Sequence, residues 1–187
     1  MGPTLTSGQK NILAMSKAEY LTQVDDSDSG TRLQVTAAIF RVDVQSSRPT
    51  ILLLKRRSHD LHSPGPFEIP SGRVDDGDFF ISDSIARAVK KQASLKVIKV
   101  LGMLREGRWV DRHSWLEDDD IKLTVTQKTV QLNWAVSVDS SDEVVVRGDD
   151  FEEFVWANWN ALGALNLKDD VRDLAKEALT WAARCLC

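Results

Sequence analysis

The sequence predicts an α+β fold in which a mixed β-sheet is packed between helices, forming an α/β/α sandwich. Three observations predict it. Short apolar strand patterns stand on both sides of one amphipathic helix at about 80–92, and a second amphipathic helix runs from Asp170 to the end of the chain. An order of strands, helix, strands and helix is typical of a sheet that is covered on both faces.

Two strands are predicted before the first long helix, at "QVTAAIFRVD" (34–43) and "TILLLKRR" (50–57). The second has four consecutive apolar residues, which indicates a strand in the interior of the sheet. The next segment, "SPGPFEIPSGR" (63–73), holds three prolines and two glycines. Because proline lacks a backbone N–H donor and glycine has greater backbone conformational freedom, we expect irregular backbone there.

The helix at about 80–92 is predicted by apolar spacing. Ile81, Ile85, Ala88 and Val89 stand at i, i+4, i+7 and i+8, so they share one face. Beyond it, "LKVIKVLGMLREGRWV" predicts a strand, a bend at Glu106-Gly107 and a second short strand. "SWLEDDDIK" (114–122) predicts an acidic surface loop.

The segment "TVQLNWAVSV" (129–138) has the cleanest alternation in the chain. Its apolar residues, Trp134 among them, point to one side and its polar residues to the other, which predicts a strand with one core face. A last strand is predicted at "FVWANW" (154–159). The final helix carries an apolar stripe at Val171, Leu174, Ala178, Ala182 and Cys185.

The first 33 residues are polar and mixed, and we expect them to form an N-terminal arm (1–33) ahead of a single domain (34–187). Ser16 and Glu19 match a capping box, in which each side chain binds the other residue's free amide. This pattern predicts a short helix over about 16–22. The following "DDSDSG" (25–30) predicts a loop.

Composition limits the class of protein. The chain has 187 residues and a formal net charge of −4, which argues against binding to a nucleic-acid backbone. No apolar run has the roughly 18 to 20 residues of a membrane helix. The cysteines are Cys185 and Cys187, too few for a disulfide framework, which favours a reducing, cytoplasmic setting. We expect no cofactor.

The stretch "FEIPSGRVDDGD" followed by an amphipathic helix resembles the Nudix superfamily. The Nudix box reads Gly, five residues, Glu, seven residues, then R-E-U-x-E-E-x-G-U, where U is aliphatic. The resemblance covers about 34–187 and is strongest to fungal members. It implies a Nudix-type sandwich; in working Nudix enzymes the glutamates of the helix hold divalent cations against a diphosphate.

The box can be carried over residue by residue. Gly72 matches the leading glycine and Asp78 stands at the first glutamate. With an insertion of one residue, Arg87 matches the arginine. The three metal-binding glutamates then fall on Ala88, Lys91 and Gln92. Removing the insertion instead puts Arg87, Lys90 and Lys91 at those positions.

These residues do not suit a divalent cation. Side chains at i, i+3 and i+4 share one patch of a helix, and Mg²⁺ prefers hard oxygen ligands. Alanine offers no ligand, glutamine offers one carbonyl, and lysine repels a cation. The sequence therefore predicts no metal site and no metal-dependent hydrolysis. Asp75, Asp76 and Asp78 are expected to cap the helix rather than rebuild the site.

Three residues are candidates for catalysis. Lys91 is positioned to act as a fixed cation in place of a metal. Glu153, beside Glu152, stands where many Nudix enzymes place a loop glutamate that acts as general base. His62, in a loop on the cleft side, is a candidate acid or base. The alternative for each is an ordinary surface residue.

Five residues are candidates for substrate binding. Lys55 and Arg57 end a buried strand and are suited to a carboxylate or phosphate. Gln131 and Asn133 occupy the polar side of a strand that Nudix clefts use. Trp109 is suited to line an apolar pocket. For Lys55 and Arg57 the alternative is a solvated strand end.

Three classes of function stay open. The preferred one is a metal-independent isomerase or cyclase, including a pericyclase, that acts on a small and fairly apolar metabolite. The others are a non-catalytic binding or regulatory module, and a residual Nudix hydrolase with relocated metal ligands. In each the partner is a small molecule rather than nucleic acid or membrane. One fold supports many functions, so the choice among these three classes depends on the residues of the site.

Overall fold

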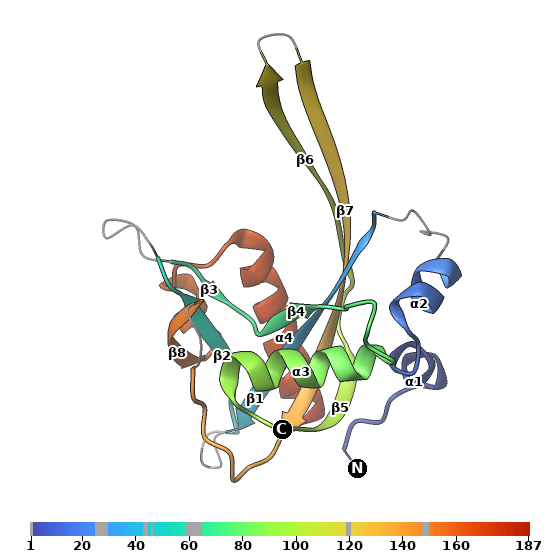
Figure 1. Cartoon of the computed structure of the whole chain (residues 1–187). Coiled ribbons are helices and arrows are strands. Elements are labelled where there is room, and N and C mark those ends of the chain that lie inside the picture. Colours follow the sequence, from blue (N-terminus) through green and yellow to red (C-terminus); the bar gives the residue numbers. More distant parts are fainter. Residues whose placement is uncertain are drawn as a thin grey trace.

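The computed structural model describes residues 2–24, 30–42, 45, 47–58, 65–118, 121–146 and 150–187. An eight-stranded mixed sheet lies between α3 (Ile81–Ala93) and α4 (Asp169–Cys185), which cover opposite faces of it (Figure 1). The predicted α/β/α sandwich is therefore confirmed. The described residues include no helix with the length and apolar character needed to span a membrane.

The sheet is built around two parallel strands in its middle. The strands are β1 (Arg32–Val42), β2 (Pro49–Arg56), β3 (Phe67–Glu68), β4 (Ser71–Arg73), β5 (Val97–Met103), β6 (Gly107–Asp118), β7 (Ile121–Val138) and β8 (Phe151–Ala157). The order is β3-β2-β1-β7-β5, with β4 added to β1, β6 to β7 and β8 to β2. Only the β1–β7 pair is parallel among these described pairs.

The N-terminal arm contains two helices, where the sequence predicted one over 16–22. They are α1 (Ser7–Leu13) and α2 (Lys17–Gln23), and each begins with a capping box. In α2 the Ser16 hydroxyl accepts from the Glu19 N–H at 3.3 Å, as predicted. The arm also packs on the body of the protein, because Tyr20 is buried within the core beneath α3.

The largest difference from prediction is the β6–β7 hairpin, which projects from the body as a long two-stranded ribbon (Figure 1). The segment 114–122 was predicted to be a loop, and for residues 114–118 and 121–122 this is wrong; residues 119–120 lie outside the described part of the chain. Ser114 pairs with Thr124, and Asp118 pairs with Ile121. The acidic residues indicated a loop, but the β-branched run at 124–126 favours a strand, and backbone pairing does not depend on side-chain charge.

The proline-rich segment also contains more regular structure than expected, since β3 and β4 lie within 63–73; residues 63–64 fall outside the described part of the chain. Gly65 explains one close approach there. A Cβ added at Gly65 would lie 1.8 Å from the carbonyl oxygen of Arg56. No side chain fits at that position, so only glycine allows the two backbone segments to approach so closely.

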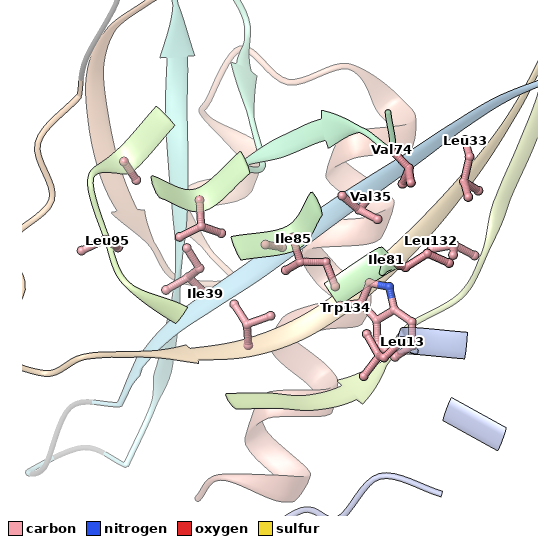
Figure 2. Packing of buried hydrophobic residues seen from close by; sticks show 14 of the residues in the cluster. Leu13, Leu33, Val35, Ile39, Val74, Ile81, Ile85, Leu95, Leu132 and Trp134 are labelled. Atoms are coloured by element: carbon pink, nitrogen blue, oxygen red, sulfur yellow. The ribbon is translucent and has the colours of Figure 1, made fainter. Parts of the chain in front are cut away.

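The sheet separates two hydrophobic cores. The first lies under α1, α2 and α3 and includes Trp134, Leu132, Ile81 and Ile85 (Figure 2). The second lies under α4 and a short 3₁₀ helix at Ala161–Gly163. The alternation in β7 explains the division: its apolar residues fill the first core, as predicted, and its polar residues face the α4 side.

Candidate functional site

The first candidate site lies where β4 meets α3, and we call it the α3-side cavity. It has a volume of about 300 Å³. Its walls come from the β4 strand and from the exposed face of α3, and its lining residues are Ser71, Gly72, Arg73, Asp75, Arg87, Ala88, Lys91 and Gln92. The three helix positions singled out from the sequence are all among them.

Helix α3 is fastened to β4 by a side-chain amide. The Ser71 N–H donates to Gln92 Oε1 at 3.0 Å, and Gln92 Nε2 donates to the Ser71 carbonyl at 2.7 Å. A Cβ added at Gly72 would lie 3.0 Å from the Cβ of Ala88, which is buried. Lys91 is exposed at the same wall and has no hydrogen-bond or ion-pair partner within the described residues.

Arg87 occupies the other end of the cavity and binds two carboxylates. Its guanidinium donates to Asp75 at 2.6 Å, to Asp78 at 2.8 Å and to the Arg73 carbonyl at 2.7 Å. The Ser84 hydroxyl also donates to Asp78, at 2.7 Å. The N-cap residue of α3 is Phe80 and not one of these aspartates, although Asp78 accepts from Ser84 in the first turn of the helix.

A divalent cation does not fit the residues present at α3. Neither alignment of the box places a carboxylate at the three helix positions, and both polar atoms of the Gln92 amide are hydrogen-bonded to Ser71. The nearby Asp75 and Asp78 are engaged by Arg87. Across the described part of the chain, no group of three or more His, Cys, Asp or Glu residues is arranged to hold a metal ion.

The second candidate site is larger and lies between β6, β7 and the first turns of α4; we call it the α4-side cavity. It has a volume of about 480 Å³, within the range of small-molecule pockets. It brings together three of the predicted binding residues, Trp109, Gln131 and Asn133. Val171 and Leu174 of α4 add apolar surface.

The amides of Asn133 and Gln131 are locked in one orientation. Asn133 Nδ2 donates to the Arg105 carbonyl at 2.6 Å, and Asn133 Oδ1 accepts from Gln131 Nε2 at 2.8 Å. Both polar atoms of Asn133 are therefore used within the protein. Gln131 Oε1 has no partner among the described residues, so it is the acceptor that the cavity offers to a ligand.

Charged residues at the rim of this cavity were not predicted from the sequence. Glu106 accepts from the Tyr20 hydroxyl at 2.7 Å and from Arg108 Nε. Burial, reinforced by the hydrogen bond to Glu106, raises the pKa of Tyr20 well above its ordinary value. Trp109 Nε1 donates to Asp111 at 3.2 Å. No local pattern reveals the contact between Tyr20 and Glu106, which lie far apart in sequence.

Two rows of polar residues cross the sheet between the cavities. Strand pairing aligns Ser71, Thr36 and Asn133 in one row. Opposed residues on neighbouring strands point to the same face, so the rows extend from the edge at β4 to the α4-side cavity. The second row is Arg73, Gln34 and Gln131. Thr36 is buried, and its hydroxyl has no partner within the described residues.

Three other predicted residues, Lys55, Arg57 and Glu153, do not line either of these cavities. Lys55 binds Glu152 at 3.0 Å and Glu153 at 3.1 Å, and these hydrogen bonds, that to Glu152 foremost, raise its pKa. Arg57 is exposed just beyond β2, and its N–H donates to the Asp150 carbonyl at 2.8 Å. His62 lies outside the described residues.

Comparison with known proteins gives a consistent result for the fold. The family profile described as "NUDIX domain" matches residues 32–182. The NUDIX domain of Shewanella oneidensis NrtR, complexed with ADP ribose, is 18% identical; the match covers 89% of this chain and 99% of that one, with a TM-score of 0.59. No significant match was found among curated proteins.

Two further structures are similar in fold, and one of them is named as a hydrolase. The C. elegans Ap4A hydrolase is 13% identical, with 82% of this chain and 98% of that chain covered and a TM-score of 0.56. A MutT/nudix family protein from Enterococcus faecalis is 15% identical, with 96% and 75% covered and a TM-score of 0.54. At these identities the likeness concerns the fold.

Proposed function

Because this chain belongs to the Nudix family, through a NUDIX domain at residues 32–182, we propose that it uses the Nudix fold for metal-independent isomerisation or cyclisation of a small organic molecule. The proposed reaction differs from the hydrolysis that names some of the structural neighbours. The reason for the difference lies on the face of α3 where the resemblance places the metal-binding glutamates.

The observation that carries the proposal is the pair of hydrogen bonds between Gln92 and Ser71. A metal ligand must keep a lone pair directed at the cation, but Gln92 Oε1 is directed at a backbone N–H. Ala88 supplies no donor atom, and Lys91 brings a positive charge. The helix therefore serves to hold β4 in place rather than to hold a cation against a diphosphate.

The α4-side cavity is the proposed reaction site. Its volume suits a small molecule, and Trp109, Val171 and Leu174 provide the surface on which an apolar skeleton packs. Gln131 Oε1 accepts a hydrogen bond from a hydroxyl or N–H of the substrate. An isomerisation or pericyclic cyclisation needs a shaped pocket and oriented hydrogen bonds more than a strong acid or base.

One cation, Lys91, is assigned the role of binding an oxygen of the ligand, and it lies at the α3-side cavity. Lys91 has no carboxylate partner in the described part of the chain, so it is free to bind a carbonyl or enolate-like oxygen of a molecule held in the α3-side cavity. Where a proton must move, Glu106 is better placed than Glu153, since Glu106 lines the α4-side cavity and Glu153 is bound to Lys55.

The test is a mass measurement on a small-molecule extract incubated with the purified protein. An isomerisation changes the retention time of a compound without changing its mass, whereas hydrolysis adds the mass of water. We expect an isomeric product whose yield is unaffected by EDTA. Gln131→Ala should reduce the yield about tenfold or more, through loss of the oriented acceptor. A product that carries added water and disappears with EDTA would refute the proposal.

A second function, non-catalytic ligand binding, is favoured by a different observation. The polar groups of the α4-side cavity are paired with one another: Asn133 with Arg105 and Gln131, and Glu106 with Tyr20 and Arg108. Such a network fixes a recognition surface and leaves few groups to transfer protons. If binding is the function, an extract compound is retained by the protein and recovered chemically unchanged, and no product accumulates.

A further inference from the structure

A third hollow lies at the other end of α4, remote in the fold from both candidate sites; we call it the arginine cavity. It has a volume of about 430 Å³ and is formed by the start of β2, the turn after β8 and the last turns of α4. Arg48, just before β2, and Arg184, in α4, both line it, and so does Trp159, which follows β8.

The charge of this cavity is unusual for the protein. The chain as a whole has a net charge of −4, yet among the described residues the lining of the arginine cavity contains two arginines and no Asp or Glu. Two like charges facing one hollow repel each other, so the arrangement is favourable when an anion lies between them. Guanidinium groups are suited to this because they bind carboxylate and phosphate oxygens with paired donors.

The two arginines also differ from others in the molecule. Arg56 is bound to Glu68 through two hydrogen bonds, and Arg87 is bound to Asp75 and Asp78. Neither Arg48 nor Arg184 has a hydrogen-bond or ion-pair partner within the described residues. Their donors are therefore available to a ligand.

The rest of the lining favours a flat ring attached to the anionic group. Trp159 is 51% exposed, and its indole N–H has no partner among the described residues. Leu179 and Ala183 of α4 supply apolar surface, and Asn160 supplies an amide. An exposed indole beside aliphatic side chains gains free energy by stacking on an aromatic ring.

From these observations we propose that the arginine cavity is a second ligand site, which binds a small aromatic anion. Its carboxylate or phosphate lies between Arg48 and Arg184, and its ring packs on Trp159. Both an aromatic carboxylate and a nucleoside monophosphate have this chemistry. The site is separate from the reaction site proposed above, and it does not depend on that proposal.

The test is calorimetric titration of the full chain with paired probes. AMP and 2-naphthoate each have a ring and an anionic group; adenosine and 2-naphthol lack the charge, and inorganic phosphate lacks the ring. We expect one of the two aromatic anions to bind at least about tenfold more tightly than its neutral partner and than phosphate. Binding of AMP alone assigns the nucleotide class, and binding of 2-naphthoate alone assigns the carboxylate class. Affinity should also fall as salt is raised.

Variants locate the binding. Arg48→Gln and Arg184→Gln should each weaken it about tenfold or more, through loss of a charge-assisted hydrogen bond. Arg112→Gln, which removes the same charge from the exposed hairpin, is the matched control and should leave it unchanged. Trp109→Ala should also leave it unchanged, since Trp109 lines the α4-side cavity. Equal weakening by Arg112→Gln, loss of binding with Trp109→Ala, or no preference for the aromatic anions would overturn the proposal.

Discussion

Gln92 accepts a hydrogen bond from the Ser71 N–H at 3.0 Å and returns one to the Ser71 carbonyl at 2.7 Å. One side chain thus supplies hydrogen-bond partners for both the N–H and the carbonyl of Ser71. This residue lies in β4, an edge strand that pairs only with β1 among the described strands. Buried or half-buried backbone groups need such partners. The position is consequently sensitive to the difference between an amide and a carboxylate.

The substitution Gln92→Glu tests this directly. Glutamate keeps the acceptor for the Ser71 N–H but turns the donor into a second oxygen, which faces the Ser71 carbonyl. We expect the free energy of unfolding to fall by about 1–3 kcal/mol, measured by urea denaturation at neutral pH. Stability should return as the pH falls through the pKa of the new carboxyl, because the protonated form is again a donor. Unchanged stability at neutral pH would contradict the structural role of Gln92.

Restoring the three carboxylates together tests the chemistry of the helix face. The variant Ala88→Glu/Lys91→Glu/Gln92→Glu should be less stable than the natural chain in EDTA, since Ala88 is buried against Gly72 and like charges are brought together. Millimolar Mg²⁺ should then raise its Tm, because a ligand that binds only the folded state stabilises it. The Tm of the natural chain should not respond to Mg²⁺. A comparable rise in the natural chain would mean that it has a metal site after all.

Tyr20→Phe tests the bond that joins α2 to the rim of the α4-side cavity. At pH 7 the loss of the hydrogen bond to Glu106 should cost about 1 kcal/mol. Because the pKa of Tyr20 is raised in the folded protein, its contribution is complete below the unfolded pKa of about 10. It then declines as the pH rises toward the folded pKa. The stability difference between the two proteins should therefore shrink above about pH 10 and change sign in favour of phenylalanine. A difference that stays constant to high pH would contradict the assignment.

Gly65→Ala tests the close approach beside β2. The added Cβ would lie 1.8 Å from the Arg56 carbonyl oxygen, a backbone atom that cannot rotate away. We expect a loss of about 3 kcal/mol or more, at the upper end of single-residue effects, read as a lowered midpoint of urea denaturation. Gly163→Ala is a matched control, since nothing lies within 4 Å of a Cβ at that position.

Much of the fold follows from residue spacing. Ile81, Ile85 and Val89 predict α3 because a helix brings them to one face, and all three are buried as expected. Alternation in β7 likewise predicts that Gln131 and Asn133 share a polar face, and they do share a cavity. These patterns are local, so a single sequence contains them.

The contacts that define the sites are not local. Tyr20 and Glu106 are 86 residues apart, and Ser71 and Gln92 are 21 apart. Their pairing depends on how separate elements pack, which spacing does not encode. The same is true of Lys55: its place at a strand end was visible, but its pairing with glutamates on β8 depends on strand order.

Strand β7 has two parts with different neighbours. Within the described residues, 121–128 pair with β6 alone, whereas 129–136 pair with β1 on one side and, on the other, with β6 up to Gln131 and with β5 from Trp134. A slip of one residue in the second part would turn Gln131 and Asn133 into the hydrophobic core, so Leu132 and Trp134 fix them in place. The first part has no such constraint. Insertions or deletions of opposed pairs in the ribbon would leave the cavity residues where they are, so related chains are free to differ in hairpin length while keeping the same chemistry at its base.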